Sequence, residues 1–173
     1  MRLSTRVGDR RFDLNKYIGK WYELAHTPSW FQHNDDYNTT ATYTPLADGT
    51  MNVTNTTINK GREVTSVGTA TQVGNTQFVV EFSTNEIAKL VSMKSYTYDG
   101  KMSHGVPNYV VVSVWKDNKT FDYKYAIVTD NDGKAVYVLS RTPCPPANEY
   151  AMLMKYVAVN FDMSTIVQTP HYM

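Results

Sequence analysis

The sequence predicts an all-β fold, an antiparallel barrel or sandwich of eight strands followed by one helix. Short runs of β-branched and aromatic residues follow one another, with turn residues between them. Asp48-Gly49 and Asp132-Gly133 are dipeptides typical of tight hairpin turns. The 173 residues suit one domain, and they match the size of an eight-stranded barrel that holds one small ligand.

Each expected strand is bounded by a loop or a tight turn. Alternation of apolar and polar residues is clearest in the fifth strand, where Phe78, Val80 and Phe82 share one face. The expected strands cover residues 21–25, 39–45, 51–59, 62–73, 77–83, 109–116, 123–129 and 135–141.

A helix is expected after the eighth strand, over about residues 146–159. Pro145 and Pro146 precede it, where proline is tolerated because its missing N–H has no helical partner. Met152, Leu153, Tyr156 and Val157 then recur at helical spacing and predict one apolar face. A short last strand is expected at about residues 165–168.

Three short motifs resemble the signatures of the lipocalin family. Gly19 and Trp21 open the first strand, Asp122-Tyr123 lies between two late strands, and Arg141 ends the eighth strand. The resemblance covers about residues 12–168 and is closest to the bacterial-type and apolipoprotein D-like branch. It implies one lipocalin domain over residues 1–173: an eight-stranded up-and-down barrel over about 19–141, a helix packed outside it, a short ninth strand, and a cup for a small apolar ligand.

The lipocalin arrangement also implies roles for the motif residues. The first strand runs from the closed end of the barrel to its mouth, and the eighth strand runs back, so Arg141 should end near Trp21. A guanidinium over an indole face contributes ~1–2 kcal/mol when shielded from water. We expect a structural plug at the closed end, formed by Gly19, Trp21, Asp122, Tyr123 and Arg141.

Alternate residues of each strand should line the cup. Glu23 is the one acid expected inside, either bonded to a neighbouring group or anchoring a ligand hydroxyl or amine. Ser113 is expected to share the inward face of its strand, and Gly68 to leave space near the centre. The expected ligand-binding residues are Glu23, Ala25, Trp30, Phe31, Tyr43, Val53, Asn55, Val64, Gly68, Phe78, Val80, Phe82, Tyr96, Tyr109, Val111 and Tyr137.

Residues 84–108 form a long insertion between the fifth and sixth strands. Loops of this length in compact domains are usually functional or disordered. In an up-and-down barrel this connection lies at the mouth, so the insertion is expected either to form a lid there or to extend the two strands into a hairpin without a ligand role.

Composition excludes several other classes of function. A formal net charge of +1 gives no electrostatic case for nucleic acid or an anionic membrane. Cys144 is the only cysteine, so no intrachain disulfide forms. The four histidines have no metal-site spacing and no Gly-x-Ser-x-Gly motif occurs, so neither a metal, a cofactor nor catalysis is expected. The N-terminus does not resemble a signal peptide, which predicts an intracellular protein, or an extracellular or membrane-associated one if a signal peptide was removed.

The expected function is binding and transport or storage of a fatty acid, lysophospholipid or similar lipid in the cup, as the resemblance implies. One alternative is a pigment such as a tetrapyrrole, haem, carotenoid or retinoid. Others are a lipid- or pigment-modifying enzyme on the same scaffold, and an interaction module that uses the insertion. The expected state is a monomer or weak dimer, with any membrane or protein partner left open.

Overall fold

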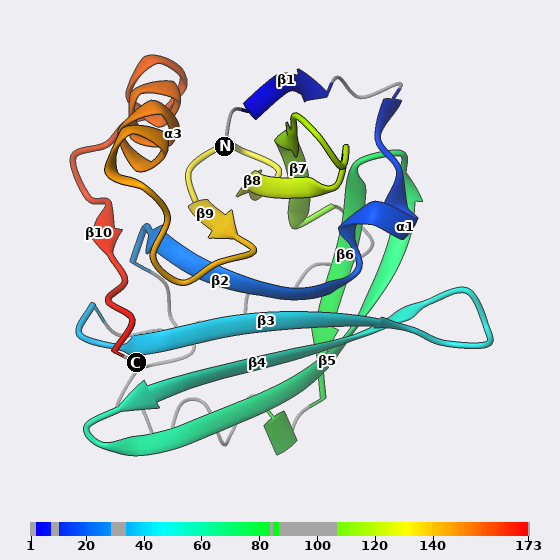
Figure 1. The fold of residues 1–173 in the computed structure, drawn as a ribbon. Helices are drawn as coiled ribbons and strands as arrows, with labels where there is room; N and C mark the ends of the chain where they lie inside the picture. The colour runs from blue at the N-terminus through cyan, green and yellow to red at the C-terminus, as the bar shows by residue number, and fades with distance from the viewer. Residues whose placement is uncertain (1–2, 8–10, 29–33, 84, 87–106, 173) are drawn as a thin grey trace.

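The computed structural model describes residues 3–7, 11–28, 34–83, 85–86 and 107–172. Eight antiparallel strands form a closed barrel in which each strand pairs with the next and the last pairs with the first (Figure 1). This confirms the predicted fold class. The barrel strands are β2 (Gly19–His26), β3 (Tyr37–Pro45), β4 (Met51–Asn59), β5 (Arg62–Gly74), β6 (Gln77–Phe82), β7 (Tyr109–Asp117), β8 (Tyr123–Thr129) and β9 (Val136–Ser140).

Turn chemistry sets the β3–β4 hairpin. The N–H of Leu46 donates to the carbonyl of Thr50, and Gly49 has a φ of 89°, a left-handed conformation that glycine adopts without steric cost. The Asp48 carboxylate accepts hydrogen bonds from the N–H and the hydroxyl of Thr50. These bonds lower the pKa of Asp48.

Two elements precede the barrel that the sequence did not predict. β1 (Leu3–Val7) pairs with β7 at its Val114–Asp117 end. α1 (Leu14–Tyr17) is a single turn that begins after Asp13, whose carboxylate accepts from the N–H of Asn15. Its last residue, Tyr17, is completely buried. α1 therefore brings an aromatic side chain to the closed end of the barrel.

One helix, α3 (Ala147–Asn160), packs against the outside of the barrel, as predicted (Figure 1). Leu153 and Val157 are fully buried in an outer cluster with barrel residues such as Ile127 and Val138. The ring of Tyr156 meets Trp115 edge to face at 5.2 Å. Within the described part of the chain, no helix combines the length and apolarity needed to cross a membrane.

The C-terminal segment, residues 167–172, lies between β2 and β3 at the mouth end. β3 pairs with β2 only from Gly19 to Tyr22, and β10 (Val167–Gln168) then pairs with the remainder of β2. The backbone carbonyl of Pro170 accepts from Asn38 on β3. The segment thus joins the two strands where they no longer pair with each other.

Candidate ligand-binding site

The barrel interior holds an inner cluster of buried side chains separate from the outer cluster under α3. Tyr43, Val53, Phe78 and Val111 belong to it, and each is at most 4% exposed. Other inward residues pack against this cluster but keep exposed surface, namely Ala41, Val80, Tyr109 and Tyr137. These four side chains are partly buried, so part of their apolar surface stays accessible.

The strand register places further predicted residues on the same inward face. Val53 pairs with Gly68, and Gly68 pairs with Phe82. Paired residues of antiparallel strands share a face of the sheet. Asn55 and Val64 lie on this face as well, because each is separated by an even number of residues from Val53 or Gly68 on its strand.

Gly68 differs from the expectation that it leaves open space. A Cβ at this position would lie 2.7 Å from the carbonyl oxygen of Glu81 and 3.0 Å from the Phe82 ring. The Phe82 ring therefore occupies the volume next to Gly68. A side chain at this position would therefore collide first with the Glu81 backbone and then with the Phe82 ring.

Two predicted inward residues face outward instead. Ala25 is completely buried in the outer cluster with Leu24, because the pairing of β2 with β9 slips between Glu23 and Ala25. Ser113 donates to the hydroxyl of Tyr156 on α3, since the pairing of β7 with β8 slips between Val111 and Ser113. Each irregularity adds one residue to a strand and reverses its alternation beyond that point.

Three tyrosines meet inside the barrel, and we call them the tyrosine cluster: Tyr17, Tyr43 and Tyr109. The hydroxyl of Tyr43 donates to that of Tyr109 at 2.7 Å, and the hydroxyls of Tyr17 and Tyr109 are also hydrogen bonded. Burial is the largest cause that raises the pKa of all three, so the hydroxyls stay neutral. Tyr17 was missed at the sequence level, although Leu14, Tyr17 and Ile18 have the spacing of a helical face.

Glu23 is 5% exposed and its carboxylate is bonded to the C-terminal segment. The hydroxyl of Thr169 donates to Glu23 Oε2 at 2.6 Å, and His26 Nδ1 lies 3.1 Å from the same oxygen. His26, which comes directly after the expected first strand, is the fully buried last residue of β2. His171 Nε2 bonds to the backbone carbonyl of Glu23.

This group of Thr169, His26 and Glu23 does not have the geometry of a catalytic triad. In a triad the acid and the nucleophile contact opposite nitrogens of the imidazole. Here the Thr169 hydroxyl and the Glu23 carboxylate both contact Nδ1 of His26, and the hydroxyl bonds to the carboxylate itself. The contacts hold the C-terminal segment against β2.

The closed end is organised by Arg141. Its guanidinium carbon lies 3.7 Å from the centroid of the Trp21 ring, the stacking expected from the sequence. Gly19 has a φ of 101°, and a Cβ there would lie 3.5 Å from Nη1 of Arg141. The guanidinium donates to the backbone carbonyls of Lys16, Tyr17, Ile18, Lys20 and Tyr123.

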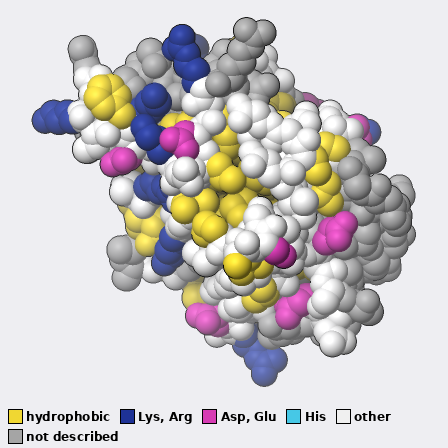
Figure 2. All heavy atoms as spheres, turned by 90° about the vertical axis from the view of Figure 1, so that its right-hand side faces the viewer, with side chains coloured by type: hydrophobic (Ala, Val, Ile, Leu, Met, Phe, Trp, Pro, Cys, Tyr) yellow, Lys and Arg dark blue, Asp and Glu magenta, His cyan; other side chains and the backbone are white. Residues whose placement is uncertain are grey.

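The other closed-end residues lie around this arginine. Asp122 is near enough for its charge to oppose the lowering of the Arg141 pKa by burial. The Tyr123 hydroxyl accepts from the N–H of Asp13 at 2.7 Å. Figure 2 shows the end of the molecule that carries α1 and the β3–β4 turn, where hydrophobic side chains gather near the middle with Lys and Arg along one side.

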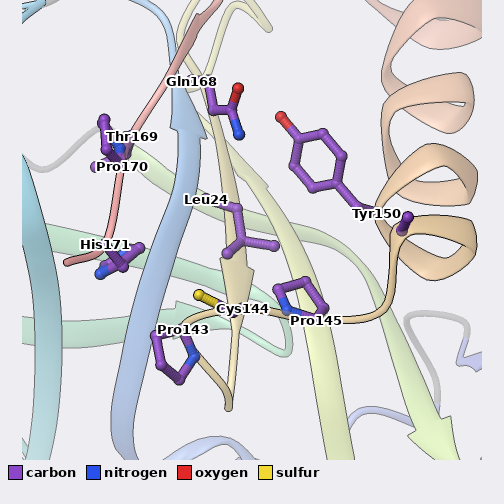
Figure 3. Close-up of a pocket in the computed structure, with 10 residues that line it drawn as sticks. Leu24, Pro143, Cys144, Pro145, Tyr150, Gln168, Thr169, Pro170 and His171 are labelled. Atoms are coloured by element: carbon purple, nitrogen blue, oxygen red, sulfur yellow. The ribbon is translucent and has the colours of Figure 1, made fainter. Parts of the chain in front are cut away.

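A cavity of about 400 Å³ lies outside the barrel between the start of α3 and the C-terminal segment. Figure 3 shows Leu24 at its centre, Tyr150 pointing from α3 toward Gln168, and the exposed thiol of Cys144 at its lower edge. The sequence did not indicate this side cavity, because the tail and the helix meet only in the folded chain.

Several predicted residues lie outside the described part of the chain. These are Trp30, Phe31 and Tyr96, together with most of the 84–108 insertion expected at the mouth. Among the residues that are described, no group of three or more His, Cys, Asp or Glu side chains is placed to hold a metal ion.

Comparison with known proteins agrees with this architecture. A model of the lipocalin-like domain matches residues 12–171. Temperature-induced lipocalin-1 of Arabidopsis thaliana is 29% identical over 91% of this chain and 78% of its own length. The outer membrane lipoprotein Blc of Citrobacter freundii is 32% identical over 76% of this chain and 63% of its own.

Solved structures show the same fold at lower identity. The cockroach allergen Per a 4 superposes with a TM-score of 0.61 and 19% identity, over 94% of this chain and 90% of the allergen. Apocrustacyanin C1 superposes with a TM-score of 0.58 and 15% identity, over 93% and 81%. The chain has a closed eight-stranded barrel, an outer helix and an Arg–Trp plug at one end, and the family model matches almost its whole length. It therefore belongs to the lipocalin family, whose members bind and transport small hydrophobic ligands.

Proposed function

We propose that the protein binds a fatty acid, lysophospholipid or similar lipid inside the barrel and carries or stores it. The observation that carries the proposal is the inner cluster together with the partly exposed side chains packed against it, Ala41, Val80, Tyr109 and Tyr137. Apolar side chains that face inward yet remain accessible gain free energy when a ligand covers them, at roughly 25 cal/mol per Å². Polar groups on the same face, such as Asn55, supply the few oriented contacts of a small-molecule site.

The proposed ligand site is the described inward set. It comprises Glu23, Tyr43, Val53, Asn55, Val64, Gly68, Phe78, Val80, Phe82, Tyr109, Val111 and Tyr137. The aromatic residues that would suit a pigment, Trp30, Phe31, Tyr96 and Tyr98, lie outside the described residues, so no observation favours a pigment over a lipid. Glu23 gives the enzyme alternative no support, because its carboxylate bonds to Thr169 and lies beside His26.

Two variants, each with one alanine replaced by tryptophan, test where a lipid binds. Ala41 faces the barrel interior, whereas Ala147 lines the side cavity. We expect Ala41→Trp to fill the interior and weaken binding of a fluorescent fatty acid at least about tenfold, which corresponds to about 1.4 kcal/mol. Ala147→Trp should leave the affinity unchanged.

The measurement is a titration of delipidated protein, with native mass spectrometry and an absorption spectrum of the protein as purified. A loss of affinity in Ala147→Trp alone would move the ligand to the side cavity. Absence of binding by the unmodified protein, with no lipid mass in the purified sample, would contradict the proposal. A coloured sample would favour the pigment alternative.

A further inference from the structure

The side cavity between the start of α3 and the C-terminal segment has walls that the protein itself holds in place. On the side of the segment, the N–H of Thr169 donates to the carbonyl of Leu24, and the Thr169 hydroxyl donates to Glu23. His171 Nε2 donates to the carbonyl of Glu23, because a carbonyl oxygen only accepts. On the other side, the outer cluster anchors α3 to the barrel. The cavity is therefore formed before a ligand arrives.

Much of the lining of the side cavity is apolar. Leu24, at the centre of Figure 3, is buried in the outer cluster, and Pro143, Pro145 and Pro170 also line the cavity. Proline has a fixed φ, so these walls lose little conformational freedom when a ligand packs against them. The volume of about 400 Å³ exceeds the ~150 Å³ of a cavity that encloses benzene. The space therefore suits one ring with a substituent.

Two polar side chains of the lining converge without being bonded to each other. Figure 3 shows Tyr150 pointing from α3 toward Gln168 of the C-terminal segment. Neither the Tyr150 hydroxyl nor the Gln168 carboxamide makes a hydrogen bond to another described residue. Burial raises the pKa of Tyr150, so its hydroxyl stays neutral. A hydroxyl and a carboxamide can each donate and accept, so both can bond to a polar group of a ligand.

The charges around the side cavity favour a neutral ligand. Among the described residues, those that line it include no Lys, Arg, Asp or Glu. Glu149 places a negative charge in the first turn of α3, where its carboxylate accepts from Tyr125 and lies 3.1 Å from Lys124 Nζ. An anionic ligand would lose hydration without a lining cation to replace it, and it would approach this like charge. A neutral polar group avoids both costs.

We propose that the side cavity is a second ligand-binding site, which takes a small neutral ring compound with one hydrogen-bonding group, such as a phenol. The ring packs against Leu24 and the prolines, and its polar group bonds to Tyr150 and Gln168. This site is separate from the barrel interior and does not depend on the lipid proposed to bind there.

Three probes of similar size test the site: p-cresol, toluene and 4-methylbenzoate. Their affinities are measured by NMR titration at neutral pH, for the unmodified protein and three variants. Tyr150→Phe keeps the ring and removes the hydroxyl, and Ala147→Trp fills the cavity that Ala147 lines. Tyr156→Phe is the matched control on the same helix, because its hydroxyl bonds to Ser113 instead. The exposed thiol of Cys144, at the edge of the cavity, reports occupancy through its rate of alkylation by a maleimide.

We expect Tyr150→Phe to lower the affinity for p-cresol, relative to toluene, by about two- to tenfold, the worth of one hydrogen bond. Tyr156→Phe should leave this ratio unchanged. Ala147→Trp should weaken the binding of p-cresol and toluene at least about tenfold. In the unmodified protein, 4-methylbenzoate should bind more weakly than p-cresol, and p-cresol should slow the alkylation of Cys144.

Binding of p-cresol that Ala147→Trp leaves unchanged, or that does not slow the alkylation of Cys144, would overturn the site. The absence of binding by all three probes would overturn it as well. An unchanged ratio in Tyr150→Phe, or 4-methylbenzoate bound as tightly as p-cresol, would overturn the proposed class of ligand. Should Ala147→Trp not fold, the alkylation of Cys144 in the unmodified protein decides the question. A lipid titration of the barrel is a separate measurement, so failure of this site differs from failure of the proposed function.

Discussion

Replacing Arg141 by Gln should destabilise the closed end of the barrel. Nη1 of Arg141 donates to the carbonyl of Lys20 at 2.7 Å, and the two protons of Nη2 are shared among three carbonyls. That makes about three effective hydrogen bonds, each worth about 1 kcal/mol net. Loss of the stacking on Trp21 adds up to about 1 kcal/mol, while partial replacement by Gln and water offsets some of the total.

We therefore expect Arg141→Gln to lower the free energy of unfolding by about 3 kcal/mol, measured by urea denaturation. For a chain of this length the thermal midpoint should fall by about 6–12 °C. Arg62→Gln, at an exposed arginine on β5, is the control and should change the stability by less than about 0.5 kcal/mol. A loss at Arg141 no larger than that of Arg62→Gln would refute the role given to the guanidinium.

Two further predictions concern the interior and the mouth. Thr169→Val removes the hydroxyl that donates to buried Glu23, so it should lower the free energy of unfolding in urea by about 1–3 kcal/mol. Thr169→Ser keeps a hydroxyl and should retain most of the stability. Equal stability of the Val variant and the unmodified protein would contradict this. The folded-state pKa values of the tyrosine cluster lie above the unfolded value of about 10, so its contribution is present below that pH and declines as pH rises above it. The urea midpoint measured from about pH 9 upward should thus fall less steeply in a variant that combines Tyr17→Phe, Tyr43→Phe and Tyr109→Phe, and parallel curves would argue against buried neutral hydroxyls.

The fold was predictable because turn chemistry and apolar alternation repeat along the chain. Asp48-Gly49 forms the tight turn that its sequence indicates, and the helix packs outside the barrel on Leu153 and Val157. Arg141 stacks on Trp21 because two antiparallel strands end at the same side of the barrel. These features depend on local sequence and on the order of the strands.

The facing of individual residues was less predictable, because strand irregularities depend on the partner strand. Ala25 follows Trp21 in the correct alternation, yet the slip between β2 and β9 turns it outward. Ser113 is reversed in the same way on β7. No local signal marks either position, since an extra residue in a strand becomes visible only when the neighbouring strand is paired with it.

Residue type alone did not distinguish the polar groups that hold the barrel together from those available to a ligand. Glu23 looked like an anchor in the sequence, but its carboxylate is bonded to Thr169 and lies beside His26. Arg141 carries the strongest donors near the interior, but they are directed to backbone carbonyls. The hydroxyls of the tyrosine cluster are bonded to one another, and its member Tyr17 comes from a turn of helix outside the expected strands. Whether a polar side chain in this barrel is already bonded within the protein therefore depends on elements that are distant in sequence, and a folded structure is needed to see those bonds.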